Sequence, residues 1–493
     1  MTPHHANALR RALESGGFAV TVEFVVPEAR EPFETAIAPA LELAQAMKGE
    51  PRCHALAIGD RIRSDHDHDP IAVAERVAEA GGTAPLVHLA GKDRSAAAVR
   101  ASLERLLALG LENVLLITGD KVKAPPGDRP VGHVDAVHAI QEAKALSPDF
   151  LVAAAVCPFK YREEECLNQY LKMVKKWRVG ADCFITQIGF DMRKLKELIA
   201  YARARGLEVP LLANVLALTA GRGRYIREHA MPGITIPDEL QALVEAEAQD
   251  PAKGAARALE RLALQALLDR VEGLEAAIPT EAAWAEAWQA SLTRPDGTLV
   301  PTAPPDGFYL DGGPPAQGVR ASVGAYAKYL ALDGLDRLLF QEGSPGARLF
   351  APLARRLPDG SRLARAVHGF ERLSKEPLGC QSCGVCRLPH TFYVCPETCP
   401  KGLANGPCGG TRENTCEFGD RECIHTLTYR LAKRAHALKA LEAVVIPAVP
   451  AERRGTCSWI HHFRGQDPPV VRLVGPRRGD PTGPPDPEAS SAS

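Results

Sequence analysis

Residues 84–118 read APLVHLAGKDRSAAAVRASLERLLALGLENVLLIT and set the pattern for the first half of the chain. Two apolar runs, 84–90 and 112–118, enclose a stretch with helical periodicity, 95–109. One face of that stretch carries Ala98, Val99, Leu103, Leu106 and Leu107. A strand, a crossover helix and a second strand form the repeating unit of a parallel sheet, so this segment predicts an α/β fold.

The same unit recurs along the chain. We expect eight strands, at 17–24, 53–58, 84–90, 112–118, 149–156, 182–188, 208–215 and 272–278. Eight repeats of strand and helix are typical of a (β/α)8 TIM barrel, which we predict for this region. A doubly wound sheet is the competing architecture, although no GxGxxG motif follows an early strand.

The composition limits the function classes. With 493 residues, two or three domains are expected. A formal net charge of -1 argues against nucleic-acid binding, and a hydrophobic content of 45% is typical of a globular protein. No apolar run reaches the roughly 18–20 residues that cross a bilayer, and the N-terminus lacks the apolar segment of a secretion signal. We therefore expect a cytoplasmic protein that does not span a membrane.

Shifts in composition divide the chain into four predicted parts. Residues 1–292 form the barrel. A Pro- and Gly-rich linker and a helical connector occupy 293–370, with a short strand at 307–310. Residues 371–463 form a cysteine-rich, metal-binding or iron-sulfur domain, and the polar tail 464–493 is expected to be disordered.

Polar residues at strand ends indicate a candidate site, because a barrel of this kind has its active site at the carboxyl ends of the strands. The candidates belong to five different strands: Glu23, His88, Asp120, Lys160 and Gln187. Any one of them could instead cap a strand end or satisfy a polar group in the barrel core. Five such residues at the same end of the barrel favour a functional site.

Three motifs carry a family resemblance: TVEFVVP at 21–27, ITGD at 117–120 and GADCFITQIGFD at 180–191. They resemble motifs of the methylenetetrahydrofolate reductases, which are flavin-dependent (β/α)8 barrels. The resemblance implies that Glu23 is the general acid and that Asp120 lies beside the flavin ring and the folate pterin.

Further contacts follow from the same resemblance. It implies that Gln187 and Phe190 contact the folate, and that His88, Thr118 and Lys176 bind the flavin, with Lys176 at its phosphate. The flavin is expected to be FAD rather than FMN.

The implied reaction reduces 5,10-methylenetetrahydrofolate to 5-methyltetrahydrofolate. Opening the folate ring requires a proton on N10, and a carboxylic acid in a poorly solvated barrel mouth, here Glu23, can supply it. A reduced flavin delivers the hydride. A carboxylate near flavin N1, here Asp120, disfavours the anionic reduced form and makes the flavin a stronger donor.

A dense cysteine cluster is the second signal. The spacing C-x2-C-x2-C-x8-C-x3-C-x8-C-x7-C-x6-C is formed by Cys380, Cys383, Cys386, Cys395, Cys399, Cys408, Cys416 and Cys423. In a reducing compartment it indicates metal binding rather than disulfides. Eight thiolates suit two sites of four: two iron-sulfur clusters, or one cluster and one zinc. The segment CPKGLANGPCGGT, residues 399–411, resembles the cysteine-rich C-terminal domain of some bacterial methylenetetrahydrofolate reductases.

The segment SDHDHDP, residues 64–70, also contains metal-binding residue types. Asp and His serve turns and helix starts as well, so we expect a solvated loop there.

We therefore predict a flavin-dependent methylenetetrahydrofolate reductase. Its expected partners are methylenetetrahydrofolate, NAD(P)H or a low-potential electron-transfer protein, and a second copy in a homo-oligomer. Two rival hypotheses stay open. One is a folate-binding barrel that serves methyl transfer, and the other is a barrel without flavin whose cysteine-rich domain docks redox partners.

Overall fold

The computed structural model describes residues 6–62, 64–121, 132–271, 280–310 and 319–473. The chain forms two compact units. The first comprises residues 1–316 with 409–413, and the second comprises residues 317–408 with 414–493. No helix among the described residues has the length and apolar character needed to span a membrane.

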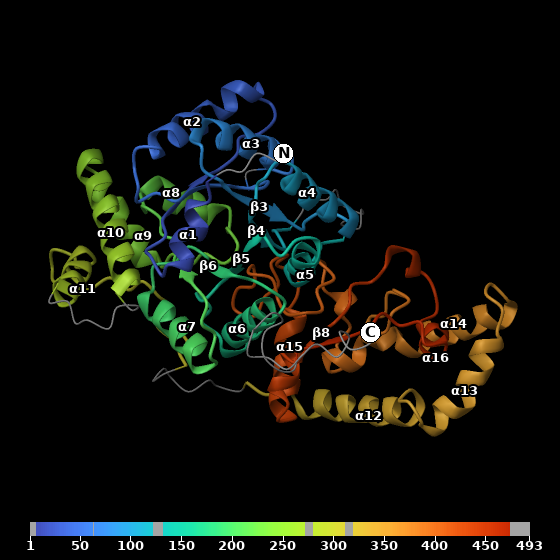
Figure 1. Ribbon diagram of the computed structural model, residues 1–493. Helices are drawn as coiled ribbons and strands as arrows, with labels where there is room; N and C mark the ends of the chain where they lie inside the picture. The colour runs from blue at the N-terminus through green and yellow to red at the C-terminus, as the bar shows by residue number, and fades with distance from the viewer. Residues whose placement is uncertain (1–5, 63, 122–131, 272–279, 311–318, 474–493) are drawn as a thin grey trace. The chain divides into compact units, whose positions relative to one another are not determined.

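A parallel sheet of seven strands organises the first unit (Figure 1). The strands are β1 (Thr21–Phe24), β2 (Ala55–Ile58), β3 (Leu86–Ala90), β4 (Asn113–Ile117), β5 (Leu151–Val156), β6 (Cys183–Thr186) and β7 (Leu211–Leu212). They pair in chain order, whereas a doubly wound sheet reverses its order at a switch point. The prediction of a (β/α)8 barrel fold is confirmed, although the expected strand at 272–278 lies outside the described residues.

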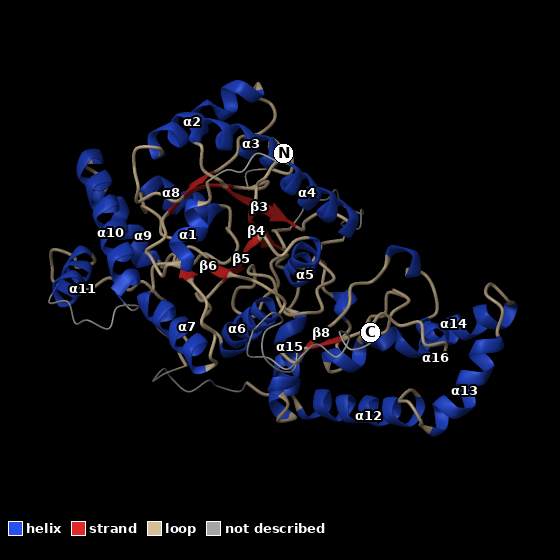
Figure 2. Ribbon diagram, viewed as in Figure 1, coloured by secondary structure: helices blue, strands red, loops and turns tan. Residues whose placement is uncertain are grey.

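Helices alternate with these strands and surround them (Figure 2). They are α1 (Ala8–Glu14), α2 (Phe33–Met47), α3 (Pro70–Gly81), α4 (Ala96–Ala108), α5 (Ala136–Leu146), α6 (Glu163–Arg178), α7 (Met192–Ala204), α8 (Ala220–Glu228), α9 (Asp238–Glu247), α10 (Pro251–Val271) and α11 (Thr280–Ser291). Side chains before the first turn cap several of them by accepting a backbone N–H, namely Asp69, Ser95, Asp135, Asp191 and Thr219.

The side chains of the strands alternate between two apolar clusters. Val87 and Leu89 of β3 pack outward with the helices, whereas Leu86 packs inward with Ala57 and Leu115. The inward cluster also contains Leu9 of α1.

Helix α1 lies at the amino ends of the strands. The amide of Ala84 donates to Ala6, and the Asn7 side chain donates to Asn113, the first residue of β4. The guanidinium of Arg10 donates to the carbonyl of Asp149, just before β5. The carboxyl ends of the strands are therefore opposite the end that α1 occupies.

The segment after α11 also packs on the first unit. The amide of Phe308 donates to the carbonyl of Tyr161 (3.2 Å), and the amide of Leu310 donates to the carboxylate of Glu197 (2.7 Å). The expected strand at 307–310 is wrong, because these amides bond to a loop carbonyl and to a side chain rather than to a neighbouring strand.

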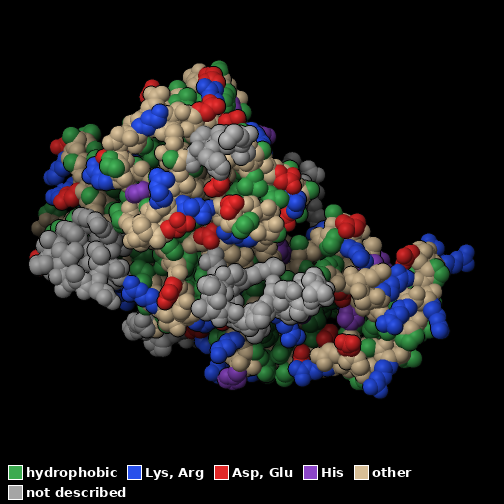
Figure 3. Space-filling model, viewed as in Figure 1, with side chains coloured by type: hydrophobic (Ala, Val, Ile, Leu, Met, Phe, Trp, Pro, Cys, Tyr) green, Lys and Arg blue, Asp and Glu red, His purple; other side chains and the backbone are tan. Residues whose placement is uncertain are grey.

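The second unit is mainly helical. It contains α12 (Val323–Leu339), α13 (Pro345–Arg356), α14 (Arg362–Lys375), α15 (Ile424–Arg434), α16 (Ser458–Phe463) and the short antiparallel strands β8 (Val444–Val445) and β9 (Val471–Arg472). Single turns of 3-10 helix lie at 376–378, 388–391, 396–398, 438–441 and 451–453. Lys and Arg side chains, in blue, gather over α13 and α14 (Figure 3).

A buried ion pair joins α6 to the start of α5. The Lys172 ammonium lies 3.0 Å from the Asp135 carboxylate, and the two side chains are 3% and 4% exposed. Burial alone would raise the pKa of Asp135, but the Lys172 charge lowers this pKa to about 2. The pair therefore stabilises the fold above the ordinary carboxyl pKa of 3.8, and this contribution is lost as the pH falls toward 2.

Replacing one partner tests this pair. Lys172→Met leaves a buried carboxylate without its cation, and we expect the free energy of unfolding at pH 7 to fall by about 3–5 kcal/mol. Lys172→Met/Asp135→Asn should recover most of this loss. Urea unfolding followed by circular dichroism measures both effects. A single variant as stable as the wild type would contradict the prediction.

Candidate functional site

Two of the predicted site residues, Glu23 and His88, meet at the inner face of the strands. Glu23 lies on β1, beside Ala57 of β2, and His88 lies on β3. Side chains of alternate strands share a layer inside a barrel. Because Ala57 between them is small, Nδ1 of His88 comes within 3.8 Å of Oε1 of Glu23.

These two side chains have different environments. The His88 side chain is 10% exposed, whereas the Glu23 side chain is 35% exposed. Burial lowers the pKa of His88, and the charges of Glu23 and Asp60 oppose that effect only in part. The imidazole is therefore held neutral beside a carboxyl group that solvent and ligands can reach.

The turn after β4 positions Asp120. Gly119 has a φ of +81°, and a Cβ there would lie 2.8 Å from the Cβ of Lys92, so only glycine fits. The hydroxyl of Thr118 accepts the amide of Ala136 at the start of α5 (3.3 Å). Asp120 itself is exposed. The structure thus places its side chain at the carboxyl end of β4, while its contact with a flavin stays a prediction.

Gln187 follows β6, and its amide is partly engaged within the protein. Its Nε2 donates to the carbonyl of Pro232 (2.9 Å), and its Oε1 accepts the amide of Ile188 (2.8 Å). Phe190 is 5% exposed and packs in an apolar cluster with Leu218 and other residues. That these two residues contact folate stays a prediction.

Lys176 lies on the side of α6 that faces the sheet. Its ammonium donates to the carbonyl of Ala155 on β5 (2.6 Å). Burial, with the nearby Lys172 charge, lowers the pKa of Lys176 to about 7. Its role at a flavin phosphate stays a prediction.

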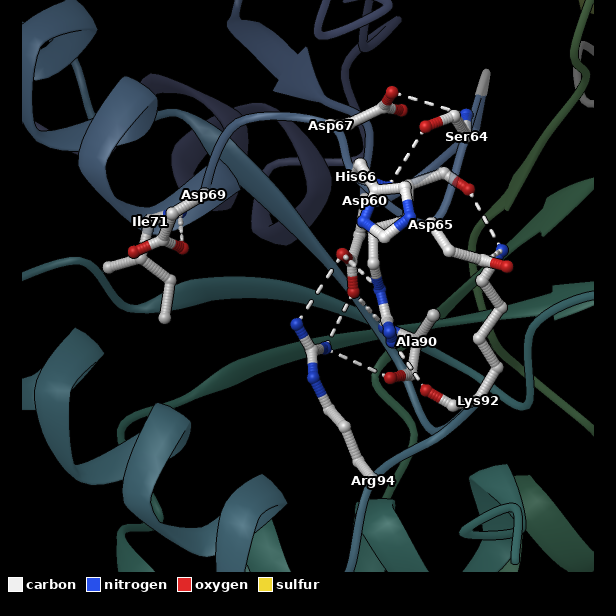
Figure 4. A network of polar contacts seen from close by, with 11 residues as sticks. Asp60, Ser64, Asp65, His66, Asp67, Asp69, Ile71, Ala90, Lys92 and Arg94 are labelled. Atoms are coloured by element: carbon white, nitrogen blue, oxygen red, sulfur yellow. Dashed lines mark hydrogen bonds and ion pairs between the residues drawn. The ribbon is translucent and has the colours of Figure 1, made fainter. Parts of the chain in front are cut away.

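A polar network that the sequence did not lead us to expect lies after β2 and β3 (Figure 4). The buried carboxylate of Asp60 accepts the amide of Ala90 (2.7 Å) and the guanidinium of Arg94 (2.6 Å). Arg61 contacts the same carboxylate (3.3 Å), and Lys92 pairs with Asp65 (2.6 Å). Asp60 lies two residues after the end of β2, and this place near a strand end was a signal that could have identified it. The network ties two loops together beside Glu23 and His88.

Three residues of the segment 64–70 bond to backbone groups, whereas Asp65 pairs with Lys92 as described above. Asp67 accepts the amide of Ser64 (3.1 Å), and Asp69 accepts the amide of Ile71 at the start of α3 (3.0 Å). The ring of His68 bonds to the carbonyl of Glu31 (2.9 Å). The first two bonds are those of a turn and a helix cap, and the third joins the segment to the loop before α2.

The eight clustered cysteines fall into two groups in the second unit. The first group, Cys380, Cys383, Cys386 and Cys395, lines one pocket. Burial raises the pKa of Cys395 to about 12, and the charges of the other three thiols contribute. The second group is Cys399, Cys408, Cys416 and Cys423. Burial and the charges of its three companions raise the pKa of Cys423.

The thiols of each group are neighbours, but they do not form a closed coordination shell. Across the described residues, no group of three or more His, Cys, Asp or Glu side chains is arranged to hold a metal ion. Four neighbouring thiols are therefore suitable metal ligands by their chemistry, but their arrangement in the structure does not define a metal site.

Parallel repeats of strand and helix, with polar side chains at the carboxyl ends of the strands, define a barrel enzyme. Residues 8–274 match the family model for methylenetetrahydrofolate reductase, and residues 362–450 match the one for the methylene-tetrahydrofolate reductase C terminal. The chain belongs to the methylenetetrahydrofolate reductase family, an oxidoreductase family. The family resemblance read from the sequence is confirmed.

Individual relatives are more distant. Methylenetetrahydrofolate reductase 1 of Schizosaccharomyces pombe is 25% identical over 159 residues, which are 31% of this chain and 26% of that protein. The match thus spans about a quarter of the relative's length. A 2,3-dimethylmalate lyase structure aligns with a TM-score of 0.31 at 14% identity, covering 45% of this chain and 84% of that one. An oxaloacetate acetylhydrolase structure gives 0.31 at 16%, covering 50% and 97%. At these TM-scores the similarity to the two structures does not contribute to the family assignment.

The contact between Glu23 and His88 can be tested by titration. Since the Glu23 charge opposes the effect of burial, Glu23→Gln should lower the His88 pKa further, while Glu31→Gln at an exposed position should not change it. NMR titration of 15N-labelled histidines measures the pKa. Neutral His88 favours folding above pH 6.5, and this contribution is lost as the pH falls below that value. A higher or unchanged pKa in Glu23→Gln would contradict the contact.

Proposed function

We propose that this chain is a flavin-dependent methylenetetrahydrofolate reductase, which converts 5,10-methylenetetrahydrofolate to 5-methyltetrahydrofolate. The observation that carries the proposal is the pair of Glu23 and His88, 3.8 Å apart, on a barrel that belongs to this family.

The residues at the carboxyl ends of the strands suit a flavin by their chemistry. His88 lies on β3, and Thr118 and Asp120 follow the neighbouring strand β4. Lys176 is the candidate for the flavin phosphate. No Cβ fits at Gly119, so the backbone of the turn before Asp120 can lie close to Lys92. A bound flavin, FAD in our proposal, supplies the hydride.

The protein's main chemical contribution in this proposal is the transfer of a proton from Glu23 to the folate. An imidazolium beside this carboxyl group would keep it ionised, because an opposite charge favours the charged form. Burial lowers the pKa of His88, so no imidazolium stands beside Glu23, and we assign Glu23 as the group that passes a proton to N10 of the folate. The partial exposure of Glu23 lets the substrate reach it.

Asp120 and Gln187 complete the proposed site. The exposed Asp120 brings a negative charge close to the reacting rings, and this charge would strengthen the reduced flavin as a donor. The second N–H of the Gln187 amide is available to the folate, since the interactions described above use its oxygen and one donor.

We further propose that each group of four thiols binds metal, as an iron-sulfur cluster or as zinc. The support is the chemistry of four neighbouring thiols in each group. The electron donor in this proposal is NAD(P)H or a low-potential electron-transfer protein. The cytoplasmic location and a homo-oligomer stay predictions from the sequence.

The role of Glu23 is tested by separating the two half-reactions. Glu23→Gln should slow oxidation of the reduced enzyme by methylenetetrahydrofolate by about 100-fold, the typical cost of losing a general acid. Oxidation of the same reduced enzyme by a quinone should be nearly unchanged, because it needs no proton on N10. Stopped-flow absorbance of the flavin follows both. Equal slowing of the two, or a protein that stays colourless after reconstitution with FAD, would contradict the proposal.

The two thiol groups are tested by metal content. If each group binds separately, Cys383→Ser should lose the metal of the first group and keep that of the second, whereas Cys423→Ser should do the reverse. Cys53→Ser in the first unit is the matched control. Anaerobic purification with iron, sulfide and zinc analysis measures the result. A wild-type protein without any of these, or complete loss of metal in both variants, would count against two independent sites.

A further inference from the structure

Residues 409–413 belong to the first compact unit, although they lie in the cysteine-rich part of the sequence. Lys160 attaches them to the barrel. Its ammonium donates to the carbonyl of Gly409 (2.8 Å) and to the carbonyl of Thr411. Lys160 lies four residues after the end of β5 and is 3% exposed. These two hydrogen bonds therefore hold the segment 409–413 at the carboxyl ends of the strands, where a barrel enzyme binds its substrates.

The attachment is specific because the Lys160 ammonium is buried without an acidic partner. Among the residues that the structure describes, no carboxylate forms an ion pair with this ammonium. Lysine is almost never fully buried unless it is paired, and burying an uncompensated charge is unfavourable. The carbonyl dipoles of Gly409 and Thr411 supply the compensation here. The ammonium and the segment thus depend on each other, and losing the ammonium would release the segment.

The segment 409–413 lies beside Gln187, the expected folate contact. A Cβ on Gly233 would lie 2.9 Å from the carbonyl oxygen of Gly409. The same Cβ would lie 3.3 Å from Sγ of Cys157 and 3.3 Å from Cγ of Gln187, so the four groups surround one point. Gly233 has a φ of +79°, which favours glycine and allows this close approach. The segment and the Gln187 side chain are therefore neighbours at the carboxyl ends of β5 and β6.

Packing between the loops after β5 and β6 fixes this arrangement. A Cβ on Gly189 would lie 2.3 Å from the ring of Phe159, so glycine is what lets this ring pack on the backbone after β6. Phe159 directly precedes Lys160 and is 5% exposed. The amide of Gln265 donates to the carbonyl of Gly189 (2.7 Å) from the other side. The loop that carries Lys160 is thus packed against the loop that carries Gln187.

Thr411 carries a polar group that the protein itself does not satisfy. Its side chain is buried, and among the described residues its hydroxyl has no hydrogen-bond partner. A buried hydroxyl without a partner is unfavourable, and folded proteins keep few of them, so this one indicates a polar group on a bound molecule. Gly409 and Gly410 precede Thr411, and the freedom of a glycine backbone allows the hydroxyl to turn toward such a molecule.

We propose that Thr411 binds the folate substrate through its hydroxyl, and that Lys160 is the positioning residue that holds Thr411 beside Gln187. The pterin ring of folate carries a carbonyl, ring nitrogens and an amino group, and a hydroxyl can donate to or accept from these. The inference rests on the proposed function, because folate is the molecule that Gln187 is expected to contact. Residues from the cysteine-rich part of the sequence then complete the folate site of the barrel.

A pair of substitutions at Thr411 tests the binding role. Thr411→Val removes the hydroxyl and keeps the shape of the side chain, whereas Thr411→Ser keeps the hydroxyl. The full-length, flavin-loaded protein is reduced with dithionite, so that it cannot react with 5-methyltetrahydrofolate, and is titrated with this folate in an anaerobic calorimeter. Thr411→Val should raise the Kd about three- to tenfold, the effect of losing one hydrogen bond. Thr411→Ser should stay within about twofold of the wild type, because it can form the same bond.

The controls separate binding from folding. Thr293→Val, which removes an exposed hydroxyl in the first unit, should leave the Kd unchanged. Urea unfolding should find Thr411→Val at least as stable as the wild type, since an unpaired buried hydroxyl is replaced by a methyl group. An unchanged Kd in Thr411→Val would overturn the proposal, and so would equal weakening in Thr411→Val and Thr411→Ser.

The positioning role of Lys160 is tested by a double-mutant cycle. Lys160→Met removes the ammonium and should weaken folate binding at least as much as Thr411→Val does, whereas Lys160→Arg keeps a cation and should recover part of the affinity. If Lys160 acts through Thr411, Lys160→Met/Thr411→Val should bind no more weakly than Lys160→Met alone. Additive losses would overturn the positioning role. Tighter binding in Lys160→Met would overturn the proposal as a whole, since the segment would then cover the site rather than complete it.

Flavin reoxidation by methylenetetrahydrofolate, measured in parallel by stopped flow, separates this inference from the proposed function. In Thr411→Val the limiting rate at saturating folate should stay within about twofold of the wild type, because the hydroxyl contributes to binding rather than to chemistry. A wild-type protein that neither binds 5-methyltetrahydrofolate nor is reoxidised would refute the proposed function. Normal reoxidation together with an unchanged Kd in Thr411→Val would refute only the role of Thr411.

Discussion

The parallel register of the first six strands is the constraint on which the candidate site depends. Backbone hydrogen bonds place Glu23 beside Ala57 and His88 beside Leu115, so the carboxyl ends of the strands form one edge. A slip of one residue in β3 would turn His88 toward the surrounding helices and bring Val87 inside. The distance between the carboxylate and the imidazole is therefore set by the sheet and by the small side chain between them, rather than by a flexible loop.

Local patterns were enough to predict the parts of the fold that depend on local chemistry. The seven described strands were expected from apolar runs, and Glu23, His88 and Asp120 from their positions at strand ends. The expected strand at 307–310 failed for a different reason. Its partners, a carbonyl of the β5–α6 loop and a carboxylate on α7, are more than a hundred residues away in the chain.

The site also contains features that no single segment specifies. Asp60 holds two loops together only because its carboxylate accepts hydrogen bonds from Ala90, on the next strand, and from Arg94, in the loop after it. Spacing alone suggested two sets of four thiols without saying which cysteines belong to which. The division at Cys395 and Cys399 needed the three-dimensional arrangement, because those two residues are close in the chain but belong to different groups.

The position of α1 bears on the order in which substrates bind and products leave. Leu9 packs into the inward cluster, and the hydrogen bonds of Ala6 and Asn7 attach this segment to the amino ends of the strands. One end of the strands is thus covered, which leaves the carboxyl ends as the side from which we expect substrates to enter. If the electron donor and the folate both react at the carboxyl ends of the strands, they enter by the same opening and cannot be bound at the same time. The first product has to leave before the second substrate enters, which is the logic of a ping-pong cycle.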